Sequence, residues 1–187
     1  MQRAVGKVRD LVLIPLFAIL IGVCSFLAIP TVIPLTMQTF GVFLAFSFLG
    51  GKKGTAAVCL YLLLGLAGLP VFSGFGSGVG VLLGLTGGYL LGWVLAGLTV
   101  WLLESLLGTR LWARVVSLVA GLIICYTAGT AWFTVTYARQ TGTVGLWTAL
   151  LWCVIPFIIP DLCKLALALW LSRRLERIER KRTNAPQ

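Results

Sequence analysis

Residues 68–92 of the chain read GLPVFSGFGSGVGVLLGLTGGYLLG, a stretch that is apolar enough to lie in a membrane although nine of its 25 residues are glycine. Glycine is a poor helix former, so the stretch is not expected to be one plain helix. Irregular backbone at membrane depth is tolerated only where it is buried in protein or lines a cavity, because lipid cannot bond to its amides. We therefore expect a folded re-entrant loop that lines a cavity.

The alternative for these glycines is close packing between helices. Gly84, Gly88 and Gly92 follow one another at the GxxxG spacing, which brings helices into contact. Packing does not account for the alternate glycines between residues 74 and 80, because residues two apart do not share a helix face. The later glycines fit either explanation, and the earlier ones favour the loop.

The composition around this stretch is that of an integral membrane protein. Of the 187 residues, 59% are hydrophobic and 11% are charged, and the mean hydropathy is +1.03. Soluble domains carry roughly 25% charged residues. The formal charge of +10 would suit a nucleic-acid partner on a soluble fold, but here the basic residues lie almost wholly between apolar segments. We expect no nucleic-acid partner.

The apolar segments predict a single all-α transmembrane domain over residues 1–187, with six helices. The spans are expected at about 11–30, 34–51, 55–72, 87–107, 114–137 and 145–172, each near the roughly 20 residues that a bilayer requires. Thirteen of the fifteen basic residues fall on one side of this arrangement. Since cytoplasmic segments are rich in Lys and Arg, both termini are expected in the cytoplasm, with the basic tail 173–187 beside the headgroups of membrane lipids.

A pair of charges interrupts the last span in the sequence IIPDLCK, residues 158–164. Asp161 and Lys164 are three residues apart and therefore share one face of a helix. Each charge costs about 2.5 to 3.5 kcal/mol at a helix centre, which makes such residues candidates for a functional site. Pro156 and Pro160 predict a bent or restarted helix beside them. The alternative is a structural ion pair, but a ligand with both donors and an acceptor fits better.

Three runs of this sequence resemble the biotin transporter BioY family, the substrate-binding S components of energy-coupling factor (ECF) transporters. The runs are PLTMQTFGVFLAFSFLGGKKG (34–54), YLLLGLAGLPVFSGFGSGVGVLLGLTGGYLLG (61–92) and IPFIIPDLCK (155–164). The resemblance implies a six-helix S-component fold in a bacterial cell membrane, with biotin bound from outside under the loop between the third and fourth helices. It also implies a transmembrane T component and two ATPase subunits as partners. Another vitamin as ligand, or a structural role without a ligand, are the alternatives.

The resemblance also assigns roles to individual residues. Asp161 and Lys164 match the family's Asp-x-x-Lys and suit the two N–H donors and one carbonyl of the biotin ureido ring. Phe72 and Tyr89 match aromatic positions that would wall the rest of biotin. The remaining candidates for the biotin site are Gln38, Ser73, Thr86, Gly87 and Gly88, of which Gln38 has an interhelical hydrogen bond as its alternative role.

Two further expectations concern the partners of the chain and of the ligand. Ala18 and Gly22 form a small-xxx-small face on the first helix, which by resemblance contacts the T component and otherwise packs within the bundle. Leu90 follows Tyr89 and supplies no cation for the biotin carboxylate, whose partner is left open among backbone N–H groups, Arg139 and water.

The sequence contains few of the residue types that enzymes use for catalysis. The chain has no histidine and five acidic residues, so paired-carboxylate, metal and His-assisted sites are not expected. It lacks GxxxxGK[ST], the loop that binds ATP phosphates, so the energy for transport would come from partner subunits. We predict no catalytic residue, no metal and no cofactor.

Overall fold

The structure is a computed structural model that describes residues 2–30 and 33–183. It is all-helical apart from one small hairpin. The long helices are α1 (Gln2–Phe26), α2 (Gln38–Leu49), α3 (Gly51–Leu66), α5 (Gly87–Leu107), α6 (Leu111–Gln140) and α8 (Ile155–Thr183). The short elements are β1 (Ala28–Ile29), β2 (Leu35–Thr36), the 3₁₀ turn η1 (Ser73–Phe75), α4 (Val79–Leu83) and α7 (Leu146–Cys153).

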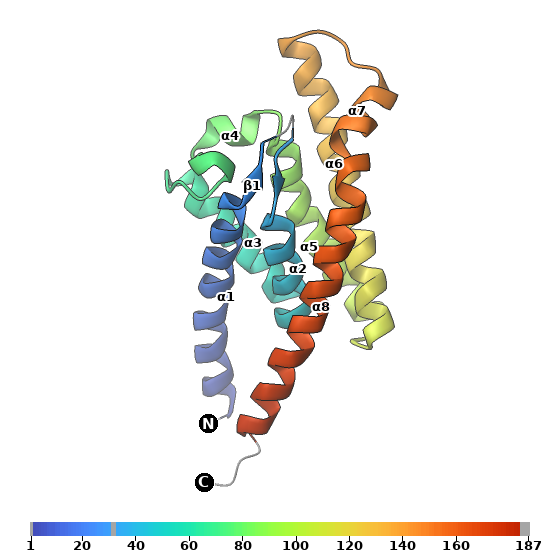
Figure 1. Ribbon diagram of the computed structural model, residues 1–187. Coiled ribbons are helices and arrows are strands. Elements are labelled where there is room, and N and C mark those ends of the chain that lie inside the picture. Colours follow the sequence, from blue (N-terminus) through green and yellow to red (C-terminus); the bar gives the residue numbers. More distant parts are fainter. Residues whose placement is uncertain (1, 31–32, 184–187) are drawn as a thin grey trace.

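The long helices form a bundle whose two ends differ in character. The start of α1 and the end of α8 lie together at one end, while the hairpin, η1 and α4 cover the opposite end (Figure 1). An ion pair of 2.8 Å joins Arg9 of α1 to Glu179 of α8. The two ends of the chain therefore lie on the same side of the bundle.

The described part of the chain has four stretches that are long and apolar enough to cross a membrane: Val8–Phe26, Gly87–Leu107, Leu111–Gln140 and Leu146–Glu179, the last of which joins α7 and α8. The helices α2 and α3 have 12 and 16 residues, so each is shorter than the segment predicted for it. The predicted spans 11–30 and 34–51 each include residues of an antiparallel hairpin that the chain forms between α1 and α2, with Ala28 opposite Thr36.

The boundary between α2 and α3 also differs from the expectation. α3 begins at Gly51, directly after Gly50, whose φ of +80° ends the preceding helix. Lys52 and Lys53 therefore lie in the first turn of α3 and not in a loop. Glu104 of α5 accepts a 2.6 Å hydrogen bond from the Gly51 backbone N–H, which satisfies one of the free amides at this helix start.

The last predicted span is two helices with a break at Val154. The break lies two residues before Pro156, so the restart that the prolines predicted is confirmed. α8 then continues to Thr183 without interruption, and residues 184–187 of the predicted tail lie outside the described part of the chain. The restart sets the orientation of α8, and with it the direction in which Asp161 and Lys164 point.

The glycine-rich segment between α3 and α5 folds back on the end of the bundle. Gly74 and Gly78 have φ angles of +69° and +82°, which other residues adopt only with strain. Phe72 is fully buried, and its ring packs on Gly65 and meets Tyr61 edge to face, with 5.5 Å between the ring centroids. Phe72 thus anchors the segment to α3.

The later glycines have the packing role that was the alternative to the loop. A Cβ added at Gly88 would collide with Cβ of Trp132, and one at Gly92 would lie 3.2 Å from the carbonyl oxygen and the Sγ of Cys125. Both contacts bring α5 close to α6. Trp132 in turn donates a 3.0 Å hydrogen bond from Nε1 to the Gly84 carbonyl. Trp132 therefore holds the end of the glycine-rich segment against α6.

Candidate functional site

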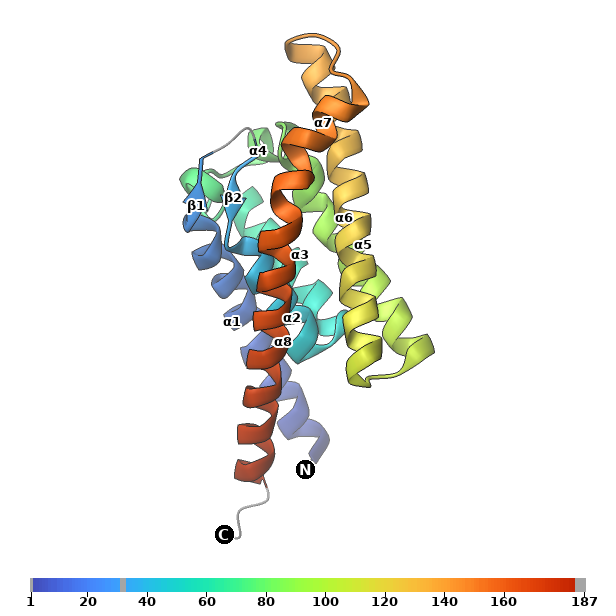
Figure 2. The same cartoon turned by 45° about the vertical axis from the view of Figure 1, so that its right-hand side comes forward.

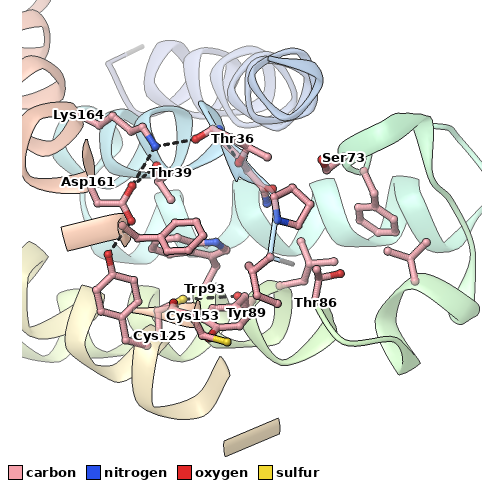
Figure 3. A pocket seen from close by; sticks show the side chains of 18 residues that line it. Thr36, Thr39, Ser73, Thr86, Tyr89, Trp93, Cys125, Cys153, Asp161 and Lys164 are labelled. Atoms are coloured by element: carbon pink, nitrogen blue, oxygen red, sulfur yellow. Dashed lines mark hydrogen bonds and ion pairs between the residues drawn. The ribbon is translucent and has the colours of Figure 1, made fainter. Parts of the chain in front are cut away.

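A pocket lies at the covered end of the bundle, where α2, α5, α6 and α8 meet the hairpin and the glycine-rich segment (Figure 3). One end of it is polar and is formed by Asp161 and Lys164. The remaining wall is mostly apolar, with Phe72, Trp93 and Phe157 among its side chains. Such a lining, apolar with a few placed polar groups, is typical of a small-molecule site.

The polar end is built around the carboxylate of Asp161, which is 1% exposed. Its Oδ1 accepts 2.9 Å hydrogen bonds from the Thr39 hydroxyl and from Nζ of Lys164. Its Oδ2 accepts a 2.8 Å hydrogen bond from the Tyr126 hydroxyl. Nζ of Lys164 also donates to the Thr36 carbonyl at 2.7 Å. Residues of α2, α6 and α8 and of the hairpin are therefore joined at one point.

The hydrogen-bonding capacity of this pair is not used up. A carboxylate has about four acceptor positions and an ammonium has three donors. Three acceptor positions of Asp161 and two donors of Lys164 have partners in the structure. Among residues 2–30 and 33–183, no further partner takes up one acceptor on Oδ2 of Asp161 and one N–H of Lys164, which are left for a ligand. The ion pair lies within α8, its hydrogen bonds reach neighbouring elements, and the pair can also bind a ligand.

Gln38 adds a second unused donor group to the pocket wall. It is the first residue of α2, it borders the pocket, and it is 7% exposed. Within the described part of the chain, its side-chain Nε2 has no hydrogen-bond partner. A buried donor without an acceptor costs about 1–3 kcal/mol, so a ligand that supplies an acceptor would remove this cost.

Tyr89 closes the wall that faces α6. Its hydroxyl lies 3.0 Å from the Thr130 hydroxyl, and it donates a 3.5 Å hydrogen bond to the Cys153 carbonyl. The ring therefore stands between α5, α6 and α7 with its polar end satisfied by the protein. It offers a ligand an aromatic face and no free donor.

The sequence model of the BioY family matches residues 1–181 of the chain. The chain belongs to the BioY family. The Thermotoga maritima protein named biotin transporter BioY is 40% identical over 177 residues, which cover 93% of this chain and 99% of that protein. The Pyrococcus horikoshii protein named probable biotin transporter BioY is 34% identical over 171 residues, which cover 91% and 98%.

A solved structure agrees with the match to the BioY family. It is described as the S-component for biotin from an ECF-type ABC transporter, and it superposes with a TM-score of 0.80 at 29% sequence identity. The superposition covers 92% of this chain and 93% of that one. The similarity therefore extends over the whole bundle.

Most of the residues that the BioY resemblance singled out meet in the pocket. They are Gln38, Phe72, Ser73, Thr86, Tyr89, Asp161 and Lys164. Gly87 and Gly88 do not line it, which differs from the expectation. A Cβ at Gly87 would collide with the Leu82 carbonyl, just as one at Gly88 would collide with Trp132. These two glycines allow α5 to begin close to its neighbours, which places Tyr89 in the wall.

The small-residue face of α1 is buried inside the bundle. Ala18 is 1% exposed, and a Cβ at Gly22 would lie 3.4 Å from the Cβ of Val71. This burial favours packing within the bundle, the alternative that the sequence left open, over a surface for a partner subunit.

Two pocket residues that hold Asp161 were missed by the sequence reasoning. Thr39 and Tyr126 lie 122 and 35 residues from Asp161 along the chain. Thr39 stands beside Gln38, which was a candidate, and a polar residue at the start of an apolar helix is a signal that could have found it. Tyr126 is one of several aromatic residues in an apolar segment, and nothing local distinguishes it.

Proposed function

We propose that this chain is the biotin-binding S component of an ECF-type vitamin transporter. The observation that carries the proposal is the buried pair Asp161–Lys164, which keeps one free acceptor and one free donor in a pocket of a BioY-family fold. Relatives that cover nearly the whole chain are named biotin transporters.

The ureido ring of biotin presents two N–H donors and one carbonyl. One N–H would donate to the free position on Oδ2 of Asp161, and the carbonyl would accept from the free N–H of Lys164. The Thr39 hydroxyl gives its own proton to Asp161 and can accept the second N–H. The unpartnered Nε2 of Gln38 is a further donor for an oxygen of the ligand.

The apolar part of biotin would lie along the aromatic wall. Phe72, Tyr89 and Trp93 all border the pocket and offer carbon surface for the thiophane ring and the valeryl chain. Ser73 and Thr86 border the pocket from the glycine-rich segment (Figure 3). They are the polar side chains that we assign to the end of the ligand nearest this segment.

We further propose an arrangement in the membrane. The six long helices would cross a bacterial cell membrane with both termini in the cytoplasm, and the glycine-rich segment would be a re-entrant loop on the outer face. Because the sequence has no ATP-binding loop, a T component and two ATPase subunits would supply the energy. Movement of the segment at Gly74 and Gly78, which tolerate changes of φ, would admit the ligand.

The ligand is tested by competition. Labelled biotin bound to the purified protein in detergent is challenged with unlabelled biotin, desthiobiotin, riboflavin and thiamine. We expect the first two to displace the label, because both carry the ureido group, and the other two to leave it bound. Displacement by riboflavin or thiamine would contradict a biotin site, and direct binding of either would make the chain an S component for another vitamin.

A further inference from the structure

The charged groups that line the pocket lie together at its polar end. Of the 18 residues in the described part of the chain that line it, Asp161 and Lys164 are the two that carry a charge. Nζ of Lys164 lies 2.9 Å from Oδ1 of Asp161, so the two charges balance one another. The pocket is therefore neutral as a whole before a ligand binds.

The opposite end of the pocket is bordered by hydroxyl groups. Ser73 and Thr86 lie there, away from Asp161 and Lys164 (Figure 3). Thr86 directly precedes α5, and its side chain forms no capping hydrogen bond with that helix, Gly87–Leu107. A hydroxyl both donates and accepts hydrogen bonds. This end of the pocket can therefore pair with a carbonyl oxygen and with an N–H group.

Other basic side chains lie away from this hydroxyl end. Figure 2 shows the start of α1 and the end of α8 together at the end of the bundle opposite α4, where three ion pairs join the helices. Arg139 is exposed in the last turn of α6 and is not among the described residues that line the pocket. Thr31 and Val32, which fall between the described ranges, are uncharged.

These charges decide which end group a ligand can bring to Ser73 and Thr86. Burying an anion without a cation beside it is costly, and hydroxyl groups offset that cost only in part. A neutral amide is matched better, because one hydroxyl can donate to its carbonyl while the other accepts from its N–H. A carboxylate has no N–H to donate. The hydroxyl end therefore gives a carboxylate little advantage over an amide.

We propose that the site also takes biotin whose carboxyl group has become a neutral amide, with an affinity close to that for biotin. The inference rests on the proposed function and extends its substrate class. In that arrangement the ureido ring pairs with Asp161 and Lys164, so the valeryl chain carries its end group toward Ser73 and Thr86. The polar end then selects the ring, and the hydroxyl end accepts either form of the chain.

The inference is tested by displacement of labelled biotin from the purified wild-type protein in detergent. The competitors are biotin and biotinamide, in which a carboxamide replaces the carboxyl group. At neutral pH the carboxyl group of biotin is ionised, so the two ligands differ by one charge. We expect their Kd values to agree within about fivefold, the effect of one hydrogen bond between neutral groups.

A cation placed at the hydroxyl end should create the missing preference. Thr86→Lys should bind biotin at least about tenfold more tightly than biotinamide, as expected for a hydrogen bond between charged groups. Thr86→Met is the matched control, because methionine has a similar length and no charge. Its two Kd values should agree as closely as those of the wild type.

Two results would overturn the inference alone. One is a wild-type Kd for biotinamide that exceeds the Kd for biotin by more than about fivefold. The other is the same ratio of Kd values in Thr86→Lys as in Thr86→Met, which would mean that the end group does not reach Thr86. Wild-type protein that binds no labelled biotin would overturn the proposed function together with this inference. The wild-type comparison stands even if Thr86→Lys does not fold.

Discussion

At the scale of single residues, the carboxylate of Asp161 is the most constrained group in the pocket. Three protein donors already hold it from α2, α6 and α8. Such an arrangement fixes the direction of the remaining acceptor before a ligand arrives, which lowers the entropy lost on binding. The cost of burying this charge is offset by those hydrogen bonds and by Lys164.

Asp161→Asn should weaken biotin binding about ten- to hundredfold, because hydrogen bonds to a charged group contribute about 1.5–3 kcal/mol. Equilibrium binding of labelled biotin measures this. Asp10→Asn is the matched control, since Asp10 forms an ion pair with Lys53 outside the pocket. An equal affinity for biotin in the two variants would remove Asp161 from the site.

Tyr126→Phe should weaken biotin binding about fivefold, the effect of losing one hydrogen bond of about 1 kcal/mol. The variant keeps the ring and loses only the contact with Oδ2 of Asp161. Tyr137→Phe serves as the control, because Tyr137 packs on Phe133 of the same helix and does not line the pocket. If Tyr126→Phe binds biotin as tightly as Tyr137→Phe does, Tyr126 does not position Asp161.

At the scale of elements, the glycines of residues 68–92 have two separate roles. Gly74 and Gly78 permit the turns of the segment, while Gly88 and Gly92 let α5 and α6 approach one another. The packing role that was the alternative for this stretch therefore holds for Gly88 and Gly92, while the re-entrant loop stays a prediction. The spacing of the glycines alone could assign these two roles only in part, because a glycine packs against a helix only where another helix lies opposite it in the fold.

Gly88→Ala should destabilise the protein by about 1–3 kcal/mol, the usual cost of overpacking, because the new methyl would overlap Cβ of Trp132. Gly80→Ala is the comparison. Gly80 lies in α4 with open space where its Cβ would be, and alanine favours a helix by about 0.5–1 kcal/mol. Thermal unfolding in detergent should give Gly88→Ala a lower unfolding temperature than the wild type and Gly80→Ala a higher one. Unchanged stability of Gly88→Ala would contradict the packing role.

The restart of the last helix could be predicted from Pro156 and Pro160, because the effect of proline is local. The hairpin could not, since strands of two residues carry no periodic pattern. The short lengths of α2 and α3 were hidden because the apolar sequence continues beyond one end of each helix, through residues 34–37 before α2 and residues 67–72 after α3.

At the scale of the whole molecule, ion pairs hold the end of the bundle that contains the termini. Arg9–Glu179, Lys53–Asp10 and Arg114–Glu176 join α1, α3, α6 and α8 there. These contacts lie away from the pocket. The bundle is therefore cross-linked by charge at one end and by the Asp161 cluster near the other.

Glu176→Gln should lower the free energy of unfolding by about 1 kcal/mol, the upper end for pairs that solvent still reaches, because it breaks the 2.6 Å contact with Arg114 in a partly buried pair. Biotin affinity should not change, since Glu176 is fifteen residues and about 22 Å along α8 from Asp161. Thermal unfolding and a binding isotherm on the same preparation measure both. A loss of biotin affinity without a loss of stability would contradict the separation of the two ends.

The pocket as a whole could be predicted only in outline. Asp161 and Lys164 were found because their spacing and their cost in a membrane are local properties. Thr39 and Tyr126 reach them through the packing of α2 and α6 on α8, which no single segment encodes. Resemblance to the BioY family supplied the aromatic wall, and the structure brought those residues to the same pocket.

The measurement that tests the central claim most directly is the equilibrium binding of biotin to the purified wild-type protein in detergent. We predict one saturable site per chain with a Kd at or below about 1 μM, equivalent to about −8 kcal/mol. Folded protein that shows no saturable binding of biotin would contradict it.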